Sequence, residues 1–130
     1  FIDRIIHIDE KKIISEYLLP EKSTFYDGHF KTHTVVPSIL QLEIMGQTGL
    51  VAHSIYLLKD LVDFDACCPL VTTIDAEFFS ICKPGMLLQV ESDIVYNRYN
   101  TIKAQIKLTN SKTQKLISQM MGICKLHKDE

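Results

Sequence analysis

Two residues of the types that move protons lie fourteen positions apart in this chain, His29 and Glu43. Glu43 is the only charged side chain in residues 38–58, which are otherwise almost wholly apolar or small. A carboxylate that is buried among apolar side chains loses its hydration, so it must be neutral, paired or used. Because a His stands in the loop just before this segment, we interpret the two residues as a base and an acid for proton transfer.

Plainer interpretations exist for each residue of the pair. An isolated His in a loop is usually a polar surface residue, and the Glu43 carboxylate could be held by the backbone or by Gln47, one helical turn further on. What favours chemistry is the combination with a helix N-terminus, whose free N–H groups attract developing negative charge. A base, an acid and such N–H groups together can move a proton next to a thioester carbonyl.

The elements that would position these residues follow from apolar periodicity. Residues 37–59 read as a helix buried on most sides, with Pro37 tolerated in its first turn. Apolar and β-branched residues alternate in six stretches bounded by turn formers, and we expect strands at residues 1–8, 13–19, 71–79, 87–96, 101–109 and 115–125. Residues 60–69 should connect the helix to the later strands. The order predicts a single α+β domain over residues 1–130, an antiparallel sheet wrapped around one long apolar helix.

The segment FYDGHFKTHTVVPSILQLEIMGQTG resembles the active-site segment of the FabZ-type 3-hydroxyacyl-[acyl-carrier-protein] dehydratases, which have a hot-dog fold. The positions that match without a gap are Gly28, His29, Phe30, Val35, Pro37, Leu40, Glu43, Met45 and Gln47. The run Phe1-Ile2-Asp3-Arg4 and the residues from Ile74 to Gly85 resemble flanking strands of the same family. The similarity therefore extends over nearly the whole chain.

The resemblance implies dehydration of a β-hydroxyacyl thioester to a trans-2-enoyl thioester in fatty-acid or polyene-type biosynthesis. His29 would remove the α-proton, and Glu43 would protonate the leaving hydroxyl, with N–H groups near Ser38 binding the thioester oxygen. Acyl chains would lie in a tunnel beside the helix. The residues expected to bind substrate are Phe30, Val36, Pro37, Ser38, Ile39, Leu42, Gln47 and Phe78.

The same resemblance implies partners and assembly. The substrate would arrive as a thioester of acyl carrier protein or of coenzyme A, and each active site would combine His29 of one subunit with Glu43 of another. Exposed edges of an apolar sheet also favour a homodimer or a higher homo-oligomer. No metal and no cofactor is expected.

Departures from the family pattern keep two other functions open. Lys31, Thr32 and Thr34 replace the prolines and glycine of the loop, and Ser38 replaces a glycine at the helix start. Lys31, Thr32 and Thr34 keep open a non-catalytic acyl-binding or assembly subunit of the same fold. A hot-dog acyl thioesterase would also place a carboxylate on this helix. The paired spacing of His29 and Glu43 favours elimination over hydrolysis.

Composition argues against several other classes of protein, and the remaining Cys and His residues have plain structural interpretations. A net charge of −2 without a basic stripe argues against nucleic acid, and the polar residues of the long helix make it a poor membrane span. Four cysteines without a CxxC pair read as free thiols of a reducing cytoplasm. His33 fits a rim position. His53, nearly opposite Glu43 on the helix, fits the core or an interface.

Overall fold

The computed structural model of the chain describes residues 1–22, 36–60, 63 and 67–128. Its strands are β1 (Arg4–Ile8), β2 (Lys12–Leu18), β3 (Cys67–Phe78), β4 (Leu87–Arg98), β5 (Thr101–Asn110) and β6 (Leu116–Lys128). Its helical segments are α1 (Ser38–Gly46), η2 (Gln47–Ala52) and α2 (His53–Leu58). The three segments follow one another without a break and make one helix of 21 residues, as the apolar run predicted.

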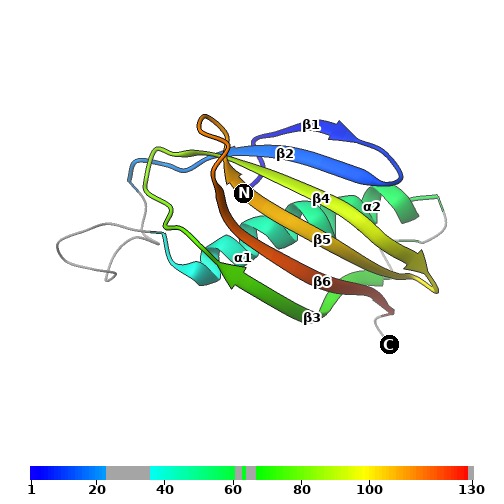
Figure 1. The fold of residues 1–130 in the computed structure, drawn as a ribbon. Coiled ribbons are helices and arrows are strands. Elements are labelled where there is room, and N and C mark those ends of the chain that lie inside the picture. The colour runs from blue at the N-terminus through cyan, green and yellow to red at the C-terminus, as the bar shows by residue number, and fades with distance from the viewer. Residues whose placement is uncertain (23–35, 61–62, 64–66, 129–130) are drawn as a thin grey trace.

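The described strands form one antiparallel sheet in the order β1-β2-β4-β5-β6-β3. Strands β1 and β2 make a hairpin, β4 to β6 make a meander, and β3 pairs with β6 at the far edge. Figure 1 shows the sheet curving over the long helix, with β1 and β3 at opposite edges. This is the hot-dog fold, so the predicted fold class is confirmed.

The alternation that predicted the sheet is clearest in β5. Ile102, Ala104, Ile106 and Leu108 are fully buried on the face that meets the helix, while the residues between them face outward. Leu88 and Val90 of β4 continue this core across the sheet. The helix adds Ile44, Met45 and Leu50. The core is therefore the layer between helix and sheet.

Strand β3 begins at Cys67, four residues before the predicted start, so the expectation that residues 60–69 only connect two elements is wrong at its end. Pro69 lies inside this strand, opposite Leu126. Proline lacks an N–H to donate, which a central strand would need on one side or the other. In the described residues β3 pairs with β6 alone, and an edge strand of this kind tolerates proline.

Glycine permits a close approach of the helix to the sheet at two points. A Cβ at Gly49 of η2 would collide with the side chain of Ile106 and lie 2.8 Å from Ser92 Oγ. A Cβ at Gly122 of β6 would lie 2.8 Å from Leu50 Cδ1. The widened π-helical turn η2 is the part of the helix that meets the sheet here, and such turns are rare.

Most of the helix is buried or half-buried, as expected, but one face is uncovered. Ile39 is 77% exposed and Ile55 is 44% exposed, and Glu43 is also exposed between them in the sequence. The apolar sequence gave no sign of this because apolar residues occupy both faces of the helix. Val71, Ile74 and Phe78 of the edge strand β3 are likewise exposed large hydrophobic residues.

Candidate active site

Backbone hydrogen bonds fix the start of the helix. Val36 N donates to Cys82 O at 2.9 Å, and Leu40 N donates to Pro37 O at 3.0 Å. Pro37 precedes the first helical residue with φ −58° and ψ 148°. No side chain among the described residues caps α1, so the first N–H groups of the helix, from Ser38 onward, have no side-chain acceptor there. A helix start of this kind favours an anionic group.

Glu43 lies on the uncovered face of α1 and is held by the next turn of the helix. Its Oε1 accepts a hydrogen bond from Gln47 Nε2 at 2.9 Å. The backbone N–H of Gln47 also donates to Glu43 O. The carboxylate is exposed, so the expectation of an unpaired, buried acid is wrong for the single chain. Its hydrogen bond to Gln47 is the plainer alternative named from the sequence.

Gln47 in turn contacts the beginning of the chain. The backbone nitrogen of Phe1 donates to Gln47 Oε1 at 2.8 Å, and the Phe1 ring packs edge-on against Tyr17 with centroids 5.4 Å apart. Burial, and then the charge of Asp3, raise the pKa of Tyr17. The predicted role of Gln47 as a substrate contact is thus joined by a direct contact with Glu43, which the sequence suggested only as an alternative.

The other predicted site residues divide by their position. His29, Phe30 and His33 lie outside the described residues, together with the departures at 31, 32 and 34. Val36 is buried in the core, and Pro37 and Leu42 are half-buried. Ser38 and Ile39 are exposed, as is Phe78. Of the residues expected to line an acyl tunnel, Ile39 and Phe78 therefore lie on open surface of the single chain, whereas Leu42 packs partly against the core.

A depression of about 200 Å³ lies elsewhere, on the outer face of the sheet across β3, β5 and β6. Its lining residues are Asp75, Glu77, Gln105, Gln119, Met120 and Met121. Register explains the polar lining, because Asp75 and Glu77 stand opposite Met121 and Gln119 on the face away from the helix. This hollow is not the predicted acyl tunnel.

His53 is a core residue, as the sequence predicted. Its side chain is fully buried, and Nε2 donates to Asp9 O at 2.7 Å in the turn between β1 and β2. Burial lowers the pKa of His53, although the hydrogen bond to Asp9 opposes this effect. Nδ1 has no partner among the described residues. A neutral imidazole protonated on Nε2 fits these contacts.

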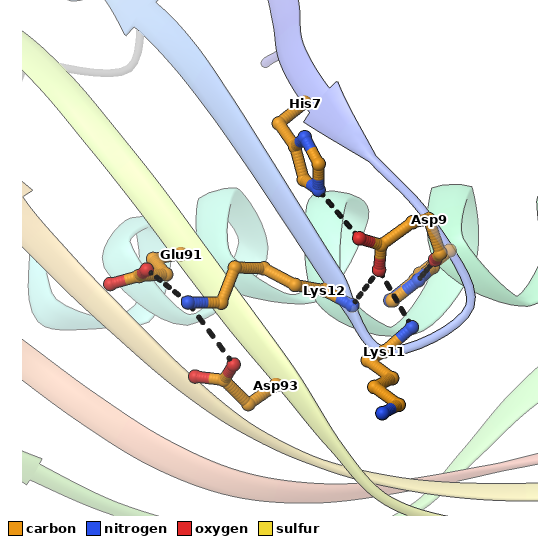
Figure 2. Close-up of polar contacts among 7 residues, drawn as sticks. His7, Asp9, Lys11, Lys12, Glu91 and Asp93 are labelled. Carbon is orange, nitrogen blue, oxygen red and sulfur yellow. Dashed lines mark hydrogen bonds and ion pairs between the residues drawn. The ribbon is translucent and has the colours of Figure 1, made fainter.

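The polar residues 9–12 predicted a hairpin turn between the first two strands, but not that this turn receives His53. Figure 2 shows the Asp9 carboxylate between His7 and the backbone of Lys11 and Lys12. Both N–H groups donate to Asp9 Oδ1 at 2.8 Å, and His7 Nε2 lies 2.7 Å from Asp9 Oδ2. These hydrogen bonds, that of Lys11 first, lower the pKa of Asp9 to about 2. An Asp followed by Glu-Lys-Lys between two strands was the available signal.

The four cysteines are free, as predicted. Cys82 and Cys124 are buried in the core, and burial raises the pKa of Cys82 to about 12. Among the described residues no group of three His, Cys, Asp or Glu side chains is placed to hold a metal ion. Within the same ranges, no helix has both the length and the apolarity needed to cross a membrane.

Comparison with known proteins indicates a family for this chain. The model of the FabA-like domain matches residues 1–119. A relative from Halalkalibacterium halodurans, described as an uncharacterized thioester dehydrase, is 26% identical over 121 residues, covering 92% of this chain and 74% of that protein. The 3-hydroxyacyl-[acyl-carrier-protein] dehydratase FabZ of Caldicellulosiruptor bescii is 35% identical over 98 residues, covering 72% of this chain and 65% of that protein.

Solved structures of similar shape include proteins of another activity. A thioesterase enzyme from Staphylococcus aureus superposes with a TM-score of 0.68 at 16% identity, covering 97% of this chain and 93% of that one. Identity this low supports a shared fold alone. The sequence relatives therefore indicate the family, and the structural neighbour supports the fold.

Proposed function

Because the chain belongs to the FabA-like domain family, we propose that it dehydrates a β-hydroxyacyl thioester to a trans-2-enoyl thioester. The observation that carries the proposal is the family match over residues 1–119, a range that contains both His29 and Glu43. The two sequence relatives, a thioester dehydrase and an acyl-carrier-protein dehydratase, support the same reaction. The substrate would be a thioester of acyl carrier protein or coenzyme A.

The reaction needs one base and one acid on the two sides of a Cα–Cβ bond. His29 takes the proton from Cα, and the electrons of that bond form the double bond as the hydroxyl leaves Cβ. Glu43 gives its proton to the hydroxyl, so water departs and the thioester bond stays intact. N–H groups at the start of α1, near Ser38, accept the negative charge that grows on the thioester oxygen.

The site would be completed by a second copy of the chain, which supplies His29 to the Glu43 of its partner. Two features of the single chain support this arrangement. Glu43 lies on a helix face that also exposes Ile39 and Ile55, and the adjoining edge strand exposes Ile74 and Phe78. Covering these apolar side chains would stabilise a dimer and enclose the acyl chain.

Hydrolysis of an acyl thioester is the second candidate. The observation that favours it is the similarity in fold to a thioesterase enzyme, together with a carboxylate that is open to solvent and to water. Hydrolysis and dehydration leave different products. Hydrolysis releases a free thiol and an acid, whereas dehydration leaves a thioester with a new double bond.

A panel of 3-hydroxyacyl thioesters of several chain lengths, carried on acyl carrier protein and on coenzyme A, tests the proposal. We expect an enoyl thioester from at least one member of the panel, and loss of that product in His29→Ala. Release of free thiol instead would support the thioesterase. No turnover of any member would favour an acyl-binding or assembly subunit that has kept the fold without the activity.

A further inference from the structure

One backbone hydrogen bond in the helix that carries Glu43 spans more residues than an α-helical bond does. The N–H of Gln47 donates to Glu43 O, four residues back, whereas the N–H of His53 donates to Thr48 O, five residues back. A turn that is closed over five residues holds one residue more than an α-helical turn. The π-helical turn η2 therefore changes the rotation of α1 relative to α2, compared with a regular helix of the same sequence.

This extra residue decides which side chains share a face. Glu43 of α1 and Ile55 of α2 are twelve positions apart, and both are exposed. At about 100° per residue, twelve regular positions would turn the two side chains about 120° away from each other. With one residue absorbed in the π-helical turn, the rotation is that of eleven regular positions, and the two side chains come to within about 20° of each other. The turn thus aligns Glu43 with Ile55 on the uncovered face.

The buried face of the helix shows the same change of rotation. Gln41 and Met45 before the turn are buried at a spacing of four residues, and Ser54 and Leu58 repeat this spacing after it. Between them, residues 48–50 of η2 are buried in succession. Three successive side chains of a regular helix spread over about 200°, so one sheet covers all three more readily where the helix is widened.

Two contacts with the sheet hold the wide turn. The hydroxyl groups of Thr48 and of Ser15 in β2 form a buried hydrogen bond of 2.7 Å. Gly49 has no Cβ, so the backbone of the turn can lie against Ile106 of β5 and Ser92 of β4. Shifting the helix by one residue against the sheet would break the first contact and bring a Cβ into the second, and both changes cost stability. Thr48 and Gly49 therefore fix where in the sequence the helix widens.

We propose that Thr48 and Gly49 are positioning residues, which hold one extra residue in the helix and thereby aim Glu43 at the uncovered face. The inference rests on the proposed function, which assigns Glu43 as the acid that meets His29 of a second copy. If the same residues were wound as a regular helix, Glu43 would point about 100° away from this direction relative to α2. Neither positioning residue touches a reacting atom, so the effect on dehydration passes through the direction of Glu43.

Changes of helix length test the extra residue. Deletion of Val51, a half-buried residue of η2, removes it, so the turn can wind as α-helix while α1 and α2 keep their relative rotation. Insertion of one alanine between Val51 and Ala52 adds a residue beyond the one already held, and it should rotate Glu43 by about 100° relative to α2. In a helix that was regular from the start, both changes would rotate Glu43 by the same angle in opposite directions.

The two length variants should therefore behave differently. The urea midpoint of unfolding should stay within about 0.5 M of the parent in the deletion and fall by about 1 M or more in the insertion, where the two buried faces no longer meet the sheet together. The kcat for dehydration should stay within about threefold of the parent in the deletion. In the insertion it should fall by about 10²-fold or more, because the acid is misdirected.

Thr48→Val tests the hydroxyl contact, because it keeps the shape of the side chain and removes the bond to Ser15. We expect kcat to fall by about tenfold while KM changes by less than about threefold, since the turn loses an anchor and substrate contacts remain. Thr48→Ser, which keeps the hydroxyl, should restore most of kcat. Thr73→Val, at an exposed position of β3, controls for a threonine-to-valine change as such and should leave kcat unchanged. An unchanged kcat in Thr48→Val would overturn the role of Thr48.

The urea midpoints separate this inference from the proposed reaction, because they need no turnover. A deletion that keeps the parent's midpoint beside an insertion that lowers it supports the extra residue even if no hydroxyacyl thioester is dehydrated, in which case only the reaction is wrong. Equal losses of midpoint in the two length variants would overturn the extra residue. Full kcat in a folded insertion variant would overturn the positioning of Glu43 and leave the reaction standing.

Discussion

The Glu43 carboxylate is exposed and accepts a hydrogen bond from the Gln47 amide. In the proposed reaction this exposure would let a substrate hydroxyl reach Glu43, and the bond to Gln47 limits the rotamers that the side chain can adopt. The sequence singled out Glu43 as the lone charge of an apolar helix. It could not show that the surrounding apolar residues divide between a covered and an uncovered face, because that division depends on where the sheet lies.

Glu43→Gln should lower the dehydration rate by about 10² to 10⁴-fold, the usual contribution of a general acid. The free energy of unfolding should change by less than about 0.5 kcal/mol, because the side chain is exposed and keeps its shape. Steady-state kinetics and urea unfolding check both parts. Glu10→Gln, at an exposed turn position, is the control. Full activity in Glu43→Gln would remove Glu43 from the mechanism.

His53 should make the fold sensitive to mild acid. Because burial lowers its pKa in the native state, the unfolded chain takes up a proton near the ordinary value of about 6.5 while the folded chain does not. The unfolded state then binds more protons, so stability is complete above that pH and falls as pH drops below it, until the lowered native pKa is reached. Asp9, whose pKa is about 2, does not titrate in this window.

Thermal unfolding of the parent and of His53→Gln across pH 5 to pH 8 checks this expectation, roughly the range in which His titrates. As the pH is lowered below about 6.5, the melting temperature of the parent should fall more steeply than that of His53→Gln. His7→Gln, which changes the exposed His of β1 beside the same turn, should keep the steep dependence. Equal slopes in the parent and His53→Gln would contradict the role of His53. Activity per folded molecule should be little changed, since His53 contacts the turn and not Glu43.

At the scale of elements, the helix and most strands could be predicted because their signals are local. The alternation in β5 and the continuous apolar run of the helix depend only on neighbours in sequence. Three features depend on contacts between distant residues and were missed: the π-helical turn, the early start of β3, and the bond between Phe1 and Gln47. A candidate site could therefore be proposed from residue types and spacing, whereas the hydrogen bonds around Glu43 needed the structure.

The two glycines of the helix test how closely η2 approaches the sheet. Gly49→Ala should lower the free energy of unfolding by about 1–3 kcal/mol, because its Cβ would collide with Ile106. Gly46→Ala is the matched control, since its Cβ would meet only Met120 Cε, at 3.9 Å. It should raise stability by about 0.5–1 kcal/mol through helix propensity. Urea unfolding of both variants gives the comparison, and a stabilised Gly49→Ala would contradict the close packing.

At the scale of the whole molecule, the open side of the fold carries the apolar residues and the acid together. The edge strand β3 and the outer face of the helix both leave large hydrophobic side chains in solvent. Surfaces of this kind are typically covered by another chain. In the proposed arrangement a second copy would complete both the apolar layer and the pair of His29 and Glu43.

Sedimentation at micromolar concentration should show at least a dimer, and Ile74→Arg should shift it toward the monomer by placing a charge in the apolar layer. Thr73→Arg, on the other face of the same strand, is the control and should remain assembled. Activity should fall with the loss of the dimer in Ile74→Arg. A fully active monomer would show that each site is complete within one chain.

The mass of a 3-hydroxyacyl thioester after incubation with the purified protein tests dehydration most directly. Dehydration predicts a product lighter than the substrate by one water, with the thioester bond intact and no free thiol released. The product should be absent with Glu43→Gln and present with Glu10→Gln. A free thiol with the matching hydroxy acid, or an unchanged substrate throughout the panel, would contradict the assignment.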